Sequence, residues 1–221
     1  MKTRIFLIAI TAVVLLSCGQ KASKNASNPD ATVKEIGESL VDMKSYYLEY
    51  KTMMSVDGIK STSTAKHWFD LKNDKFVTET ITETDMMGQV TKNRNLTIST
   101  DKGVYSIDLD NKTGIKMSND DYEDDPINNI KSEDNETFRR LIESEGGKIL
   151  GNEDFMGKSC ILIELMSEGS KSKMWYYKGI PLKIEAQSYK MEATKFEEGV
   201  SIPDSKFDIP GGVTITEGPS M

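Results

Sequence analysis

The side chains that could perform acid–base or nucleophilic chemistry are few and scattered. The single histidine, His67, stands beside Trp68 in a strand-like segment, where an imidazole could act as a general base. No motif places a serine or cysteine nucleophile next to it, so we expect a packing or surface role. One histidine and two cysteines also exclude His-rich metal cages and Cys-rich zinc or iron–sulfur sites. The sequence therefore predicts a protein that is not an enzyme.

Two acidic segments could offer carboxylate oxygens to a cation such as Ca²⁺. Residues 119–125 (NDDYEDD) do not have the spacing of an ordered calcium loop, and a solvated charge run is the simpler interpretation. Residues 108–114 (DLDNKTG) begin like such a loop, but Lys112 occupies a ligand position and no Glu follows at the required spacing. We therefore expect neither a metal nor a cofactor.

Cys18 has the clearest chemical assignment. A positively charged start precedes the apolar residues 5–16, which have the length of a signal-peptide core and are too short to span a bilayer. Residues 15–19 (LLSCG) follow and resemble a bacterial lipobox. This motif implies cleavage before Cys18 and attachment of acyl chains to it, palmitate among them. An ordinary secretory signal that happens to contain a cysteine is the alternative.

Lipidation of Cys18 would anchor the protein to a membrane. Two or three acyl chains, at roughly 0.8 kcal/mol per buried methylene, hold stably, whereas one chain is marginal. Cys160 would then lack a disulfide partner, and its alternation with Ile161 and Ile163 predicts an inert, buried thiol. We expect a lipid-anchored protein of the cell envelope, at the outer membrane because no Asp follows Cys18, with the leaflet and face left open.

The charge balance narrows the range of partners. The 221 residues contain 28 Lys and Arg against 35 Asp and Glu, for a formal net charge of −7. Nucleic-acid binding needs clustered basic side chains and is not expected. Anionic head groups would also repel so acidic a domain, so we expect its body to stand off the membrane surface.

The chain divides into a signal peptide (residues 1–17), a lipidated flexible tether (18–31) and one domain (32–216). The small polar tether should span roughly 20 Å. A helix is predicted at 32–41, where Thr32 and Glu35 form a capping box. A second helix is predicted at 136–144, after an acidic loop at 118–132.

Hydrophobicity alternates with period two over most of the remaining chain, with turn residues about every ten positions. The predicted strands are 46–56, 59–71, 76–84, 90–100, 104–109, 115–117, 148–152, 159–167, 172–178, 181–189 and 191–197. Threonine at alternate positions of 76–84 indicates a solvated sheet face. The sequence therefore predicts a meander of antiparallel strands, whose edges must be closed or covered.

The C-terminal half carries a succession of turn and packing motifs. They are residues 151–160 (GNEDFMGKSC), 175–183 (WYYKGIPLK) and 202–210 (IPDSKFDIP). This succession resembles the outer-membrane lipoprotein-sorting, LolA-like superfamily, including uncharacterised lipoproteins of Bacteroidetes-type bacteria. The similarity is good over 148–210 and only architectural over 32–117.

The resemblance implies a mainly β (α+β) fold, a curved antiparallel half-barrel sheet covered by one or two short helices. Between sheet and helices the superfamily has an apolar cavity, which in characterised relatives holds acyl chains of lipids or lipoproteins. Carriers of this superfamily are soluble shuttles. A chain with its own lipid anchor is expected to resemble the membrane-fixed acceptors instead.

Large aromatic, aliphatic and methionine side chains can line such a cavity or simply fill a core. The candidate ligand-binding residues are Tyr46, Leu48, Tyr50, Met54, Ile161, Ile163, Leu165, Trp175, Tyr177, Leu182 and Ile184. Two functions stay open. One is a membrane-anchored lipoprotein that binds lipid or another apolar ligand without chemistry. The other is an envelope protein–protein interaction module with a filled core and an unknown protein partner.

Overall fold

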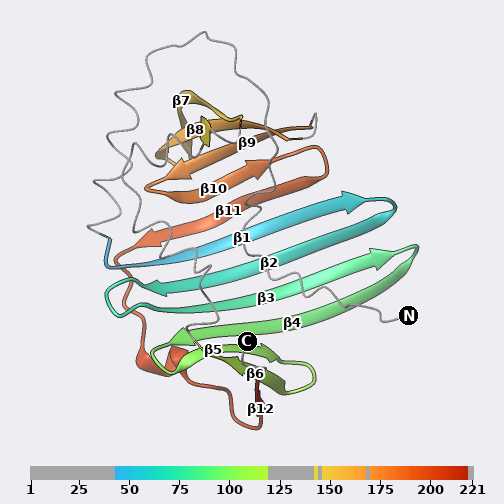
Figure 1. Ribbon diagram of the computed structural model, residues 1–221, viewed down its shortest axis with the longest axis vertical. Helices are drawn as coiled ribbons and strands as arrows, with labels where there is room; N and C mark the ends of the chain where they lie inside the picture. Colours follow the sequence, from blue (N-terminus) through green and yellow to red (C-terminus); the bar gives the residue numbers. More distant parts are fainter. Residues whose placement is uncertain (1–42, 119–141, 144–145, 168–169, 219–221) are drawn as a thin grey trace.

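A computed structural model describes residues 43–118, 142–143, 146–167 and 170–218 (Figure 1). Twelve strands form one open, curved sheet, in the order β12-β6-β5-β4-β3-β2-β1-β11-β10-β9-β8-β7. Two meanders therefore meet where β1 pairs with β11. Every pairing is antiparallel except that of β12 with β6, which is parallel.

The strands differ in length, and the four longest lie side by side in the sheet. Their bounds are β1 Ser45–Val56, β2 Ile59–Asp70, β3 Lys75–Met86, β4 Gln89–Thr100, β5 Gly103–Asp108, β6 Thr113–Met117, β7 Lys148–Phe155, β8 Lys158–Ser167, β9 Ser170–Tyr177, β10 Ile180–Glu185, β11 Tyr189–Glu198 and β12 Thr214–Glu217. A 3₁₀ turn, η1 (Asp204–Phe207), lies between β11 and β12. Each of β1 to β4 is twelve residues long.

Tight turns join the long strands. Asp57 and Gly58 between β1 and β2 have φ values of 49° and 82°, as a two-residue type I′ turn requires. This turn twists in the same sense as its strands, and it fixes the register so that Val56 pairs with Ile59. The β3–β4 hairpin turns in the same way at Met87 and Gly88.

All eleven predicted strands are confirmed, with boundaries that shift by a few residues. The predicted strand 181–189 is shorter, because β10 ends at Glu185 and β11 begins at Tyr189. β12 was not predicted. The described part is mainly β, and the expected covering helices are not confirmed. Residues 32–41 lie outside the described residues, and of 136–144 only Ile142 and Glu143 are described, in helical conformation.

No helix within the described ranges is long and apolar enough to cross a membrane.

Three hydrophobic clusters stabilise the sheet. The largest contains Met43, Tyr46, Leu48, Cys160, Leu162, Trp175, Ile180, Leu182 and Ala193, and we call it the central cluster. A second cluster joins Ile142 to Ile161 and Ile163. The third consists of Val77, Leu96, Ile98 and Ile107.

The C-terminal segment covers the third cluster. Phe207, Val213 and Ile215 pack against it, and Lys206 pairs with Glu79 at 2.5 Å. A Cβ atom at Gly114 of β6 would lie 2.7 Å from Cδ1 of Ile215. The glycine therefore leaves the space that lets Ile215 of β12 pack here. One face of β3 to β6 is thus closed by the chain's own C-terminal segment.

Candidate functional site

The structure places most of the predicted cavity residues in two separate packed clusters. Tyr46, Leu48, Trp175 and Leu182 belong to the central cluster, against which Tyr50 and Tyr177 pack. Ile161, Ile163 and Leu165 belong to the second cluster instead, because β8 contributes its alternate residues Cys160 and Leu162 to the central one. Met54 and Ile184 are half-buried and belong to neither cluster.

The strand register shows that β1 to β4 share one continuous face that carries no charged side chain. Directly paired residues of antiparallel strands lie on the same face of a sheet. The row that runs through Tyr50 is Tyr50, Ala65, Thr80 and Asn95. We call the set of such rows the uncharged face. Its members are Tyr46, Leu48, Tyr50, Thr52, Met54, Val56, Ile59, Ser61, Ser63, Ala65, His67, Phe69, Phe76, Thr78, Thr80, Thr82, Thr84, Met86, Gln89, Thr91, Asn93, Asn95, Thr97 and Ser99.

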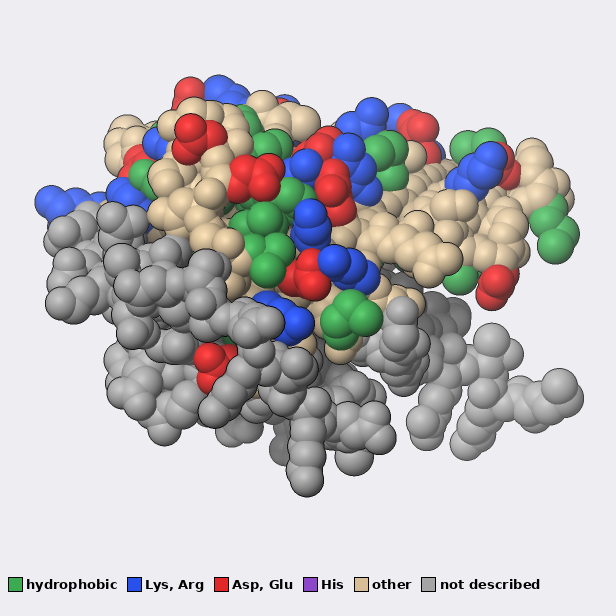
Figure 2. All heavy atoms as spheres, turned by 90° about the horizontal axis from the view of Figure 1, so that it is seen from above, with side chains coloured by type: hydrophobic (Ala, Val, Ile, Leu, Met, Phe, Trp, Pro, Cys, Tyr) green, Lys and Arg blue, Asp and Glu red, His purple; other side chains and the backbone are tan. Residues whose placement is uncertain are grey.

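The opposite face of the same strands carries all of their Lys, Arg, Asp and Glu side chains. These are Glu49, Lys51, Lys60, Lys66, Asp70, Lys75, Glu79, Glu83, Asp85, Lys92 and Arg94. Lys92 pairs with Glu83 at 2.8 Å, and Arg94 with Asp110 at 2.7 Å, in exposed positions. Acidic and basic side chains also lie side by side at the β7 end of the molecule (Figure 2). Outside the third hydrophobic cluster, which lies on this face under the C-terminal segment, the charged face is therefore suited to water.

Aromatic rings form a row across one end of the uncharged face and onto β11 and β9. Its members are Phe76, Phe69, Tyr46, Phe196 and Tyr177, and we call it the aromatic row. Tyr46 stacks on Phe69 with ring centroids 4.5 Å apart, and Phe69 lies 5.6 Å from Phe76. Phe196 lies 5.9 Å from Tyr46 and 5.7 Å from Tyr177. Such pairs add stability beyond their buried area and hold the rings in place.

Tyr50 and His67 lie between the aromatic row and the rest of the face. The Tyr50 hydroxyl donates to the carbonyl oxygen of Pro181, and burial holds the pKa of this phenol well above its usual value. His67 Nδ1 lies 2.9 Å from Oγ1 of Thr78, and burial lowers the pKa of the imidazole to about 4. Both side chains are therefore neutral at pH 7, and the face keeps no charge.

Lowering the pH should destabilise the fold through His67. The unfolded chain binds a proton at the ordinary pKa of about 6.5, whereas the folded chain resists protonation down to about 4. The contribution of His67 to stability is therefore fully present above about pH 6.5 and is lost as the pH falls from 6.5 to 4, by about 3 kcal/mol. Because this is the single histidine, the difference between wild-type and His67→Gln unfolding curves isolates the effect. A ring titration midpoint near 6.5 by NMR would contradict this expectation.

The remainder of the uncharged face carries hydroxyl and amide groups. We call this region the hydroxyl–amide stripe: Ser61, Ser63, Thr78, Thr80, Thr82, Thr84, Thr91, Asn93, Asn95 and Thr97. Ser61 shares a 3.3 Å hydrogen bond with Thr84, and Thr82 donates to Ser63 at 3.2 Å. Alternating threonines in β3 predicted a face exposed to solvent. In the structure Thr80, Thr82 and Thr84 are only half-exposed.

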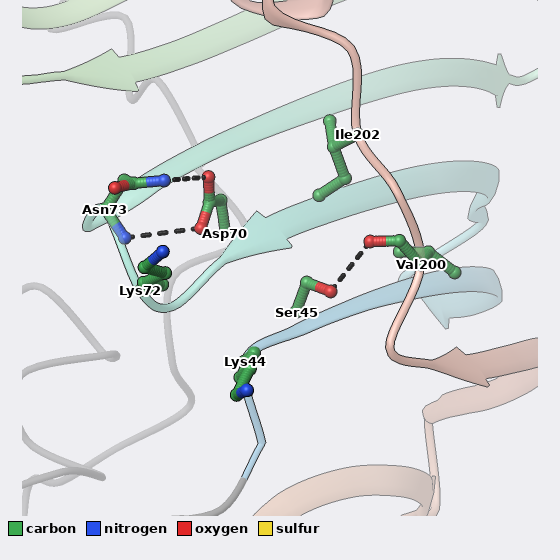
Figure 3. Close-up of a pocket in the computed structure, with 7 residues that line it drawn as sticks. All are labelled: Lys44, Ser45, Asp70, Lys72, Asn73, Val200 and Ile202. Carbon is green, nitrogen blue, oxygen red and sulfur yellow. Dashed lines mark hydrogen bonds between the residues drawn. The ribbon is translucent and has the colours of Figure 1, made fainter.

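Two shallow hollows lie beyond the aromatic row, where β1 begins. The first, of about 210 Å³, is lined by Lys44, Ser45, Asp70, Lys72, Asn73, Val200 and Ile202 (Figure 3). The second, of about 290 Å³, is lined by Met43, Lys44, Lys178, Glu198 and Gly199. Both are smaller than a typical ligand pocket and have charged walls. They form a polar rim at this end of the sheet.

Most of the rim's polar groups are already engaged with one another. Glu198 accepts hydrogen bonds from Lys158 at 3.0 Å, Lys178 at 2.6 Å and the Tyr177 hydroxyl at 3.0 Å. These bonds hold the pKa of the Glu198 carboxyl below its usual value despite burial, which opposes the shift. In the first hollow the Ser45 hydroxyl donates to the carbonyl of Val200 (Figure 3). The Glu198 contacts therefore join β8, β9 and β11 at this end of the sheet.

The remaining sequence candidates have structural roles where they are described. Asp108 accepts hydrogen bonds from the backbone of Asp110 and Asn111, which makes it a turn residue. Cys160 is buried, donates weakly to the carbonyl of Lys158 at 3.5 Å, and has a pKa that burial raises. Within the described ranges, no three His, Cys, Asp or Glu side chains are grouped to hold a metal ion. The acidic run 119–125 lies outside those ranges.

The chain matches no protein-family model and no curated protein. Among solved structures, an uncharacterised conserved protein from Thermus thermophilus is similar in fold, with a TM-score of 0.52, 8% identity, and coverage of 86% of this chain and 100% of that one. LprF from Mycobacterium bovis has a TM-score of 0.41 and 7% identity, covering 81% and 99%. The lipoprotein LppX from Mycobacterium tuberculosis has a TM-score of 0.34 and 11% identity, covering 80% and 100%.

At these identities the likeness concerns the fold alone. One of these neighbours, LppX, is a lipoprotein, but membership of this chain in the LolA-like superfamily and the Bacteroidetes-type origin remain a resemblance of sequence.

Proposed function

We propose that this protein is a lipid-anchored lipoprotein of the bacterial cell envelope that binds a lipid or another apolar ligand and performs no chemistry on it. The observation that carries the proposal is the uncharged face of β1 to β4. The solvated part of the opposite face carries many charged side chains, whereas the uncharged face carries none. A face free of charge and partly aromatic is suited to contact with hydrocarbon instead.

The candidate residues differ in how they would serve such a ligand. Leu48, Trp175 and Leu182 are buried in the central cluster and would support the face from within. Tyr50 and Met54 are half-buried on the uncharged face, where a ligand can reach them. A methionine side chain adapts to irregular apolar shapes, so Met54 is well suited to a flexible chain.

The surroundings of His67 and Cys160 support a role without catalysis. His67 is bonded to a threonine hydroxyl and is uncharged at neutral pH. Cys160 is buried, and its raised pKa keeps the thiol protonated and unreactive.

Anchoring through Cys18 completes the proposal, and it rests on the lipobox-like residues 15–19. The tether 18–31 would join the acyl chains to the domain 32–216. The outer membrane is the proposed location, and a lipid or a lipoprotein is the proposed partner of the uncharged face.

Native mass spectrometry tests the ligand. The mature chain with Cys18→Ser, exported to the periplasm of a bacterial host, should carry co-purified lipid of discrete mass. Met54→Asp places a charge on the uncharged face and should abolish that mass shift. The neighbouring Met53→Asp is the matched control, because Met53 points to the charged face and is 40% exposed. A clean apo mass for the parent chain would overturn lipid binding.

Exposed apolar side chains favour a second candidate, an envelope protein–protein interaction module. Met87 at the tip of the β3–β4 hairpin is 95% exposed, with Met86 and Val90 exposed beside it. Exposed apolar groups that cluster at a tip are typical of protein contact sites. A clean apo mass together with cross-linking from this tip to another envelope protein would favour this function.

A further inference from the structure

We propose that the ligand is a neutral amphiphile, with its hydrocarbon over β11 and β1 and its uncharged hydrogen-bonding head on the hydroxyl–amide stripe. This inference rests on the proposed function and names the class of molecule that the uncharged face selects. Its basis is the change in side-chain chemistry from one strand to the next within the same rows.

Four of the six rows across the sheet, those through Leu48, Tyr50, Thr52 and Met54, pass from apolar to polar side chains in the same direction. Met191 of β11 pairs with Thr52, which continues through Ser63 and Thr82 to Asn93. The neighbouring row begins with Tyr189 and Met54 and continues through Ser61 and Thr84 to Thr91. In these four middle rows the boundary between apolar and polar chemistry therefore runs parallel to the strands, close to β1.

The polar part has the dimensions and the chemistry of a small head group. Neighbouring strands lie about 4.8 Å apart, so β2, β3 and β4 present a polar strip roughly 10 Å wide from first to last strand. Hydroxyl and amide groups both donate and accept hydrogen bonds, which suits the hydroxyls and esters of sugars or glycerol.

Part of this stripe remains available for hydrogen bonding. In the described part of the chain, Thr80, Asn93 and Asn95 have no side-chain hydrogen-bond partner, while Ser61, Ser63, Thr82 and Thr84 bond to one another. Asn93 and Asn95 are exposed and Thr80 is half-buried. An arriving head group would therefore meet free amides at the edge of the stripe and a free hydroxyl nearer its middle.

The same face offers nothing to neutralise an ionic head group. A charge that leaves water needs an opposite charge or dense hydrogen bonding, or its transfer is unfavourable. On β1 to β4 every Lys, Arg, Asp and Glu lies on the other face. Lys178 and Lys158 on the rim are already bound to Glu198. The face therefore discriminates against both anions and cations.

Three probes with the same alkyl chain test this selectivity: decyl maltoside, decyl sulfate and decyltrimethylammonium, each below its micelle concentration. Calorimetry on the mature chain with Cys18→Ser should show decyl maltoside binding about tenfold more tightly than either ion. Equal affinities for all three would overturn the neutral-amphiphile proposal and leave the proposed function standing. If none of the three binds, the proposed function itself fails.

A positive charge placed on the stripe should remove most of the selectivity against the anion. Thr80→Lys should strengthen decyl sulfate binding about five- to tenfold and leave decyltrimethylammonium weak. Thr64→Lys is the matched control, because Thr64 is an exposed strand threonine on the charged face, and it should change neither affinity. Asn95→Lys, at an exposed position of the stripe, serves the same purpose should Thr80→Lys fail to fold. An equal gain in Thr64→Lys would overturn the assignment of the head-group site.

Discussion

Leu182→Ala should lower the free energy of unfolding by about 2–5 kcal/mol. Leu182 lies in β10 with none of its surface exposed, in the central cluster with Trp175 and Ile180. Truncation removes buried methyl groups and leaves a cavity that the surrounding strands can only partly close. The loss would be a large share of the roughly 5–15 kcal/mol that stabilises an ordinary domain. Urea denaturation followed by tryptophan fluorescence measures it directly.

Leu150→Ala provides the comparison within the same sheet. Leu150 is also a strand leucine, but it is 42% exposed in β7, so its loss should change stability by well under about 1 kcal/mol. Similar losses for the two variants would mean that the central cluster is loosely filled. A mild effect of Leu182→Ala would then favour an interior cavity, and the ligand would be sought there and not on the uncharged face.

The strands could be predicted from the sequence because each has its signal nearby. Alternation and turn pairs such as Asp57-Gly58 lie within a few residues of the hairpin that they specify. β12 carries no such signal. Its four residues follow a Pro- and Gly-rich segment, and their partner is β6, about a hundred residues earlier in the chain. A parallel pairing over such a separation depends on the packing of Ile215 beside Gly114, which only the folded structure brings together.

The sequence predicts which candidate residues of one strand share a face, but not which faces of different strands pack together. Alternation alone places Tyr46, Leu48 and Tyr50 together on β1, and the structure agrees. Which face of β8 joins them depends on irregular register in the intervening strands. Pairing shifts between Glu49 and Tyr50, and again between Pro181 and Lys183. A shift of one residue exchanges the two faces of a strand. This explains why Cys160 and Leu162, and not Ile161 and Ile163, join the central cluster.

The uncharged face left a signal in the sequence that strand-by-strand inspection does not use. In β2 and β3, serine and threonine alternate with charged residues, as in Thr78-Glu79-Thr80 and Thr82-Glu83-Thr84. One strand of this kind indicates a solvated surface. Only the register shows that the serines and threonines of neighbouring strands fall on the same side and the charges on the other. The pairing of neighbouring strands therefore joins the alternating serines and threonines of each strand into one continuous uncharged surface.

Cys18→Ala should abolish acylation and release the protein from membranes. If the lipobox-like residues 15–19 direct lipidation, the acyl chains depend on the thiol of Cys18, and without it none should be attached. Loss of two or three acyl chains, each with more than about ten buried methylenes at roughly 0.8 kcal/mol apiece, removes essentially all membrane affinity. Metabolic labelling with an alkyne analogue of palmitate, followed by membrane fractionation, reads out both effects.

The second cysteine makes this experiment internally controlled. Cys160 is buried, and its thiol donates to a backbone carbonyl, so the acylating enzymes cannot reach it in the folded protein. Cys160→Ser keeps a hydrogen-bond donor at this site and should retain full labelling and membrane association. Labelling that survives in Cys18→Ala but disappears in Cys160→Ser would reverse the assignment. Continued membrane association of unlabelled Cys18→Ala would instead indicate that the apolar residues 5–16 remain as an uncleaved anchor.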